Sequence, residues 1–119
     1  MEARELAEKI AQLMIEKKAE DVKIFDIKEI TTIVDYFVIC SASSDTQVKA
    51  IANHIKDETT KMGEKPWHNE GMNNLSWVLM DYVNVVVHIF HNNTRRFYNL
   101  EGLWADAEIT EVKDEAEIG

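Results

Sequence analysis

The sequence predicts a single α/β domain in which helices back a mixed β-sheet of about five strands. The chain has 119 residues, of which 45% are hydrophobic, so it supplies one moderate core and not two. Apolar residues recur at helical spacing in two stretches, and runs rich in β-branched and aromatic residues lie between and after them. The predicted order is a helix, two strands, a second helix, three strands and a short helical C-terminus. This order is typical of a sheet that packs against helices.

The first predicted helix covers residues 2–19, where one side is rich in Glu, Lys and Arg. Its apolar positions recur at helical spacing: Leu6, Ile10, Leu13 and Met14. Residues 22–27 form a strand candidate with β-branched and aromatic side chains. Residues 35–41 form a second strand candidate that is apolar on both faces, which predicts a central position in the sheet.

A capping box begins the second helix. The side chain of Ser44 can accept a hydrogen bond from a free backbone N–H while Gln47 reaches back toward the start of the helix. The helix then has one apolar stripe, and Gly63 marks its C-terminal end. The stripe consists of Val48, Ile51, Ala52, Ile55 and Met62. A short strand over residues 66–68 and a loop over residues 70–74 follow.

Two longer strand patterns, residues 76–82 and 85–91, predict a hairpin with Val83-Asn84 as its turn. In that register Trp77 lies opposite Phe90. One face then carries only apolar side chains or tyrosine and is expected to pack under the helices: Val78, Met80, Tyr82, Val85, Val87 and Ile89. The other face mixes aromatic, acidic and imidazole groups: Trp77, Leu79, Asp81, Val86, His88 and Phe90.

The end of the chain is rich first in aromatic and then in acidic residues. Asn92 or Asn93 is expected to cap a short turn carrying Arg95 and Arg96, and five large apolar side chains follow within residues 97–104. Residues 105–119 hold six acids against one lysine, a net charge of −5, which leaves −4 on the rest of a chain of −9. We therefore divide the chain into a folded domain over residues 1–107 and a poorly ordered acidic tail over residues 108–119.

Composition restricts the partners and the cellular location. A net charge of −9 argues against direct nucleic-acid binding and favours a partner rich in Lys and Arg. A single cysteine excludes an internal disulfide and suits a reducing compartment. No run approaches the roughly 20 apolar residues of a membrane span, and the N-terminus lacks the pattern of a signal peptide. We expect a cytoplasmic protein that does not bind membranes.

The residue pattern favours no catalytic, metal or cofactor site. Cys40 lies in the predicted central strand, where an inert buried thiol is expected. His88 and His91 lie three apart on a strand and face opposite sides, so they cannot share a metal ion. The turn at residues 40–45 is similar to the strand-to-helix entry of nucleotidyltransferases, but such enzymes hold magnesium with several carboxylates and Asp81 stands alone. A helix cap is the favoured interpretation, and a nucleotide-binding or nucleotidyltransferase-like protein is the alternative.

Several motifs, taken together, resemble the ribosomal silencing factor (Iojap-like) family over residues 3–107. They read DYFVICS, SDTQVKAI, WVLMDY, VVVHIFH and RFYNLEGLW, in family order and spacing. The chain departs from the family pattern at Ala42-Ser43, where Gly-Thr is usual, and at Val83-Asn84, where Gly-Asp is usual. It also departs at Gly102, where a larger and often basic residue is usual.

The resemblance implies a nucleotidyltransferase-like fold without enzymatic activity. It also implies binding to ribosomal protein number fourteen on the intersubunit face of the large subunit, which would block subunit joining and repress translation. In this chain the expected apolar anchors are Trp77, Phe90, Tyr98, Leu100, Leu103 and Trp104. Asp81 and Glu101 are expected to meet Lys or Arg of the partner, and His88 to add a hydrogen bond. The protein is expected to be a monomer or a weak homodimer.

Overall fold

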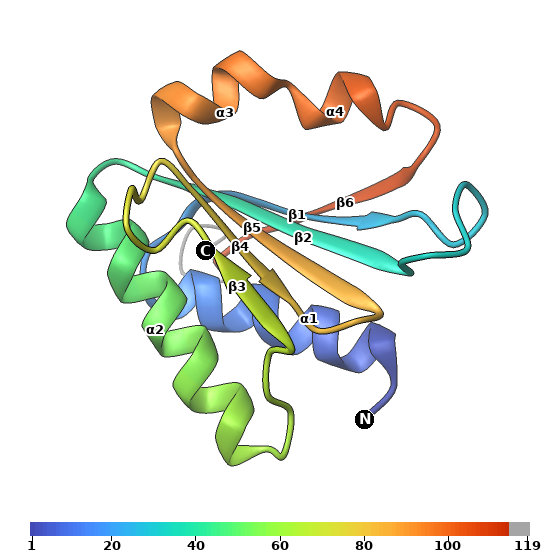
Figure 1. The fold of residues 1–119 in the computed structure, drawn as a ribbon. Coiled ribbons are helices and arrows are strands. Elements are labelled where there is room, and N and C mark those ends of the chain that lie inside the picture. The colour runs from blue at the N-terminus through green and yellow to red at the C-terminus, as the bar shows by residue number, and fades with distance from the viewer. Residues whose placement is uncertain (115–119) are drawn as a thin grey trace.

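The computed structural model describes residues 1–114 and contains one six-stranded mixed sheet with helices on both faces (Figure 1). The strand order is β3-β4-β5-β2-β1-β6, so the sheet has one strand more than the five expected. Helices α1 and α2 cover one face, and the short helices α3 and α4 lie over the other. The elements are α1 (Ala3–Glu16), β1 (Glu20–Asp26), β2 (Tyr36–Ala42), α2 (Asp45–Lys61), β3 (His68–Glu70), β4 (Trp77–Asp81), β5 (Val85–His91), α3 (Asn92–Tyr98), α4 (Leu100–Leu103) and β6 (Glu108–Val112).

Both long helices bury the apolar stripes that the sequence predicts. The predicted stripe of α1 is buried throughout, and that of α2 is buried except for Met62. The Ser44 hydroxyl accepts from the Gln47 backbone N–H at 3.1 Å, as the capping box predicts. The Gln47 side chain accepts from the Ser43 N–H at 2.9 Å and also donates to the Lys18 carbonyl at 2.9 Å. The cap of α2 is therefore tied to the end of α1.

The two central strands run parallel, and every other strand pairing is antiparallel. In β2 all side chains except that of Phe37 are buried, which confirms the predicted central position. On the face toward α1 and α2, β2 and the hairpin form the main core, together with the apolar stripes of the two helices. Tyr82 ends that layer, and its hydroxyl lies 2.8 Å from the buried Thr59 hydroxyl of α2.

The β4–β5 hairpin has the predicted register. Trp77 pairs with Phe90, and the Tyr82 N–H donates to the Val85 carbonyl across the two-residue turn at 2.8 Å. Val83 adopts a φ of 77° in the left-handed region, which is strained for a β-branched residue. The Asp81 carboxylate accepts from the Val83 N–H at 2.7 Å and so stabilises this turn without the glycine that such turns favour.

The short strand β3 begins two residues later than predicted. Trp67 lies before it, and the Trp67 N–H donates to the Asp81 carbonyl at 2.7 Å. Gly71 follows the strand at a φ of 88°, and a Cβ there would collide with the backbone carbonyl of Trp77. This turn therefore requires glycine.

The division at residue 107 needs correction, because residues 108–112 form the edge strand β6 and not part of a poorly ordered tail. β6 pairs antiparallel with β1, and the register places Glu108 opposite Asp26. The high acid content concealed a short strand with three β-branched residues, Ile109, Thr110 and Val112, and the free edge of β1 supplies its hydrogen bonds. Residues 115–119 of the predicted tail lie outside the described residues.

Candidate protein-docking surface

The segment that carries α3 and α4 packs on the mixed face of the hairpin and creates a second, smaller core. Its buried members are Phe25, Ile27, Ile39, Phe90 and Leu100. His91 caps α3, because its ring nitrogen accepts from the Asn93 N–H at 3.4 Å, where the sequence predicted an asparagine. Asn99 separates the two helices at a φ of 36°, a left-handed conformation that asparagine tolerates. This sharp break returns the chain across the sheet.

Trp77 is the centre of an aromatic network on this face. Its ring stacks on Phe90 at a centroid distance of 4.9 Å and meets Tyr98 at 4.8 Å. Its indole N–H donates to His88 Nδ1 at 3.1 Å. Phe37 meets His88 edge-on at 4.8 Å and Trp104 at 5.1 Å, so strands β2, β4 and β5 are linked to the C-terminal segment through aromatic contacts.

Part of this network faces solvent. Phe97 is 81% exposed, Leu103 73% and Tyr98 44%, while Trp77 and Trp104 are half-buried. We call these five residues the aromatic surface. Large apolar side chains gathered on one small segment are typical of a protein-binding site. The predicted site omitted Phe97, although adjacent aromatic residues at positions 97 and 98 on a short helix cannot both be buried under one face.

Two of the expected anchors lie inside the molecule. Phe90 is 1% exposed and Leu100 is 8% exposed, because α3 and α4 cover the sheet there. Their side chains therefore hold the aromatic surface from below and offer no area for a partner. His88 is also buried, with Nδ1 occupied by Trp77 and with no partner for Nε2 among residues 1–114.

The two expected acidic contacts have intramolecular partners. Asp81 lies at the opposite end of β4 from Trp77, and its carboxylate accepts from the Val83 N–H. The Glu101 carboxylate lies 3.1 Å from Arg95 Nη2. Both side chains remain half-buried, so each still contributes negative charge near the surface.

The buried Arg95 connects α3 to the sheet. Its guanidinium donates to the Asp21 carbonyl at 2.7 Å and to the Ser41 hydroxyl at 3.0 Å. It also pairs with the carboxylates of Glu101 and Asp21, at 3.1 and 3.3 Å. A bulge in β1 holds Asp21 at a φ of 53°, in the region where the β1–β2 register shifts. The sequence predicts Arg95 on a short turn, and no local pattern indicates that its side chain is buried.

Arg95 also bears on the nucleotide-binding alternative. It lines the cavity beside the end of β2 and bonds to Ser41, which belongs to the nucleotidyltransferase-like stretch at residues 40–45. Both of its charge partners belong to this chain, so its positive charge is already matched. Within residues 1–114 no three His, Cys, Asp or Glu side chains lie close enough together to hold a metal ion. In the same range no helix is long and apolar enough to span a bilayer.

Cys40 is expected to resist thiol reagents in the folded protein. Its side chain is fully buried in β2, and burial raises the pKa of the thiol to about 12. A chromogenic disulfide reagent at pH 8 should therefore detect no thiol in the native state and one per chain in guanidinium. Rapid labelling of the folded protein, at the rate of free glutathione measured in parallel, would contradict this assignment.

Acid is expected to destabilise the fold through His88. Burial lowers the pKa of His88 from 6.5 to about 4, so the unfolded chain takes up a proton at a higher pH than the folded one. The stability contribution is intact above pH 6.5 and falls as the pH is lowered toward 4, by about 3 kcal/mol. Urea unfolding across this range should show the loss in the wild type and in the control His68→Gln. His88→Asn, which keeps an acceptor for Trp77, should reduce the dependence of the unfolding free energy on pH. A pH dependence equal to that of the wild type would contradict the assignment.

Comparison with known proteins identifies the family. A family model described as "Ribosomal silencing factor during starvation" matches residues 1–118. Ribosomal silencing factor RsfS of Bacillus subtilis is 44% identical over 97 residues, which are 82% of this chain and 82% of the relative. That of Halalkalibacterium halodurans is 40% identical over 113 residues, 95% of this chain and 97% of the relative. The chloroplastic protein Iojap of Zea mays is 32% identical over 111 residues, 93% of this chain and 48% of the relative.

Solved structures share the fold. A crystal structure of a Chromobacterium violaceum protein superposes with a TM-score of 0.85 at 26% identity, covering 96% of this chain and 95% of that one. One from Bacillus halodurans gives a TM-score of 0.75 at 38% identity, covering 91% and 95%. The expected α/β fold and the family resemblance are thus confirmed. Matched along nearly its whole length, the chain belongs to the ribosomal silencing factor family, whose members associate with the ribosome and regulate translation.

Proposed function

We propose that this protein silences the large ribosomal subunit by docking its aromatic surface on a basic ribosomal protein at the intersubunit face. The family resemblance suggests protein number fourteen of the large subunit as that partner. Once bound, the domain would occupy space that the small subunit needs, so the subunits could not join and translation would fall. This mechanism is steric and requires no catalysis or cofactor, and it acts in the cytoplasm, where subunits join.

The observation that carries the proposal is the exposure of Phe97, Tyr98 and Leu103 on the α3–α4 segment. Two sets of contacts hold this segment against the sheet. From below, the second core fixes α4 through Leu100, and Arg95 fixes α3 to the sheet. Anchors that are already ordered lose little conformational entropy on binding, which favours affinity. Trp77 and Trp104 extend the surface at its half-buried margin.

Charge supports the choice of a basic partner. The chain carries −9, so a protein rich in Lys and Arg would be attracted from a distance and would associate faster at low salt. Asp81 and Glu101 are proposed to contribute to this attraction. Because both carboxylates have partners within the chain, their proposed role is long-range attraction and not the formation of new ion pairs.

The test is a subunit-joining experiment in a sucrose gradient. Purified large and small subunits are mixed at a magnesium concentration that permits joining, with and without the protein. We expect the joined peak to fall and the protein to co-sediment with the large subunit alone. Full joining in the presence of saturating protein, or sedimentation with the small subunit, would overturn the proposal. A parallel calorimetric titration with nucleotide and magnesium should give no heat; binding there would favour the nucleotide-binding alternative.

A further inference from the structure

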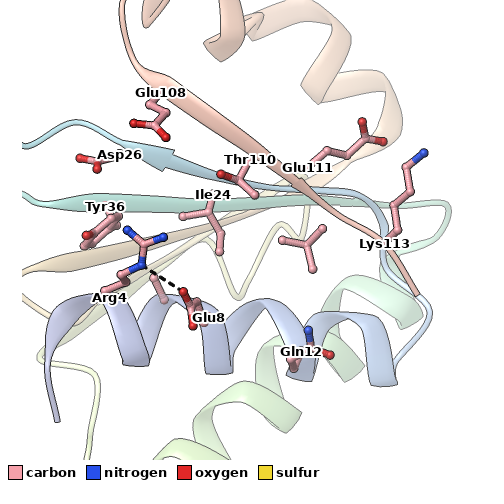
Figure 2. A pocket seen from close by; sticks show the side chains of 12 residues that line it. Arg4, Glu8, Gln12, Ile24, Asp26, Tyr36, Glu108, Thr110, Glu111 and Lys113 are labelled. Atoms are coloured by element: carbon pink, nitrogen blue, oxygen red, sulfur yellow. Dashed lines mark hydrogen bonds and ion pairs between the residues drawn. The ribbon is translucent and has the colours of Figure 1, made fainter. Parts of the chain in front are cut away.

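A groove lies at the β6 edge of the sheet, apart from the aromatic surface. The groove has a volume of about 380 Å³ and lies between α1 and the strands β1 and β6 (Figure 2). From α1, Arg4 and Glu8 face it and bond to each other at 3.1 Å. From the sheet, Asp26, Tyr36 and Glu108 border it. It lies on the α1 side of the sheet, whereas the aromatic surface lies on the α3–α4 side.

β6 is an edge strand with an open outer side. It pairs with β1 alone, and within residues 1–114 no backbone group bonds to its outer edge. Its first four residues are exposed, whereas Val112 at its end packs against the main core. An edge of this kind can accept a further strand, in which backbone hydrogen bonds supply affinity and alternate side chains supply specificity.

The groove holds four carboxylates against two cations, and one of these cations, Arg4, is already bonded to Glu8. The carboxylates are those of Glu8, Asp26, Glu108 and Glu111, and the second cation is Lys113, so the charge beside this edge is negative on balance. Asp26 and Glu108 are direct register partners on adjacent strands, and like charges in that position destabilise a sheet. Asp26 has a cation nearby, because Lys28 Nζ lies 3.6 Å from its carboxylate. Glu108 forms no ion pair or hydrogen bond with residues 1–114. A cation supplied from the open edge would therefore relieve a repulsion that the chain itself leaves in place.

We propose that β6 accepts an extended, Lys- or Arg-bearing segment of a partner protein as a seventh strand. Alternate side chains of the added strand would point to the α1 side. A lysine there, about 4.8 Å from β6, reaches back to Glu108 along its flexible stem. A second copy of this chain is a poorer occupant, because its own β6 carries Glu108 and Glu111 and no lysine or arginine. This interaction is separate from the aromatic surface and does not rest on the proposed function.

The test uses three synthetic peptides of roughly six residues, the length of an average strand. The first alternates lysine with threonine or valine, the second has glutamate in place of lysine, and the third is the first with alternate backbone amides N-methylated. We expect only the first to bind, to slow amide hydrogen exchange in β6, and to bind more weakly as salt is added. Binding of the glutamate or N-methylated peptide with equal affinity, or no binding of the first, would overturn the proposal.

Two matched charge reversals locate the contact. Glu108→Lys should weaken binding of the lysine peptide by about tenfold, because it removes an attraction and adds a repulsion. This variant should remain folded, since the new lysine can pair with Asp26 across the strands. Glu5→Lys makes the same change at an exposed position of α1 outside the groove and should alter binding by less than about twofold. Equal losses in both variants, or protection of β6 that rises with protein concentration, would contradict the assignment.

Discussion

Replacing Arg95 with alanine is expected to lower the free energy of unfolding by roughly 2–4 kcal/mol, which is more than we expect for any other single substitution in the α3–α4 segment. The reason is the position of the guanidinium, which is buried and bonds to Asp21, Ser41 and Glu101. Its removal leaves the Asp21 carbonyl and the Ser41 hydroxyl without a partner and opens a cavity under α3. The loss should lie below that of a wholly buried ion pair, because the two carboxylates are partly exposed and remain solvated.

Urea unfolding at pH 7 measures this effect, and the neighbouring residue supplies the control. Arg96 is exposed, and among residues 1–114 its guanidinium hydrogen bonds only to Asn93. Arg96→Ala should therefore change stability by no more than about 0.5 kcal/mol. Arg95→Lys should fall between the two, because lysine keeps the charge but not the planar fork that reaches several acceptors. Equal stabilities for Arg95→Ala and Arg96→Ala would refute the bridging role.

The hairpin shows how far local pattern determines structure. On both strands every second residue is apolar or tyrosine, and with two residues between the strands only one register joins these positions into a continuous apolar face toward the helices. The structure has that register, even though Val83 must adopt a positive φ. The capping box before α2 and the stop at Gly63 are likewise local signals, and they are confirmed.

What the pattern could not predict depends on contacts between distant residues. Arg95 and Asp21 are 74 positions apart, so no local stretch of sequence indicates that the two residues bond to each other. The same holds for Phe90 and Leu100, which were expected on the surface because nothing local showed that α3 and α4 return across the sheet. The prediction for residues 108–112 was wrong for a different reason. Their glutamates are typical of a solvated tail, and only the fold shows that β1 has an open edge with which these residues can pair. The errors at Arg95, Phe90 and Leu100 thus lie where α3 and α4 cover the sheet, which is where the candidate site is built, whereas the error at β6 lies at the edge of the sheet.

Removing the exposed side chains of the aromatic surface is expected to weaken large-subunit binding without unfolding the domain. Phe97→Ala and Leu103→Ala truncate residues that are 81% and 73% exposed, so each should change stability by at most about 0.5 kcal/mol. As central anchors, each should cost roughly 2 kcal/mol or more of binding, which is about thirtyfold or more in affinity. Co-sedimentation with purified large subunits, at a series of protein concentrations, measures the change.

Trp67→Ala is the matched control, because Trp67 is 76% exposed but lies beside β3, near the Asp81 end of β4. It should bind as the wild type does, and so distinguish a defined surface from general loss of exposed aromatic area. Trp77→Ala is a less specific test, since its ring packs on Phe90 and its N–H bonds to His88, so stability would fall as well. If Phe97→Ala and Leu103→Ala bind normally but alter the mass measured by light scattering, the aromatic surface joins copies of this chain and ribosome docking lies elsewhere.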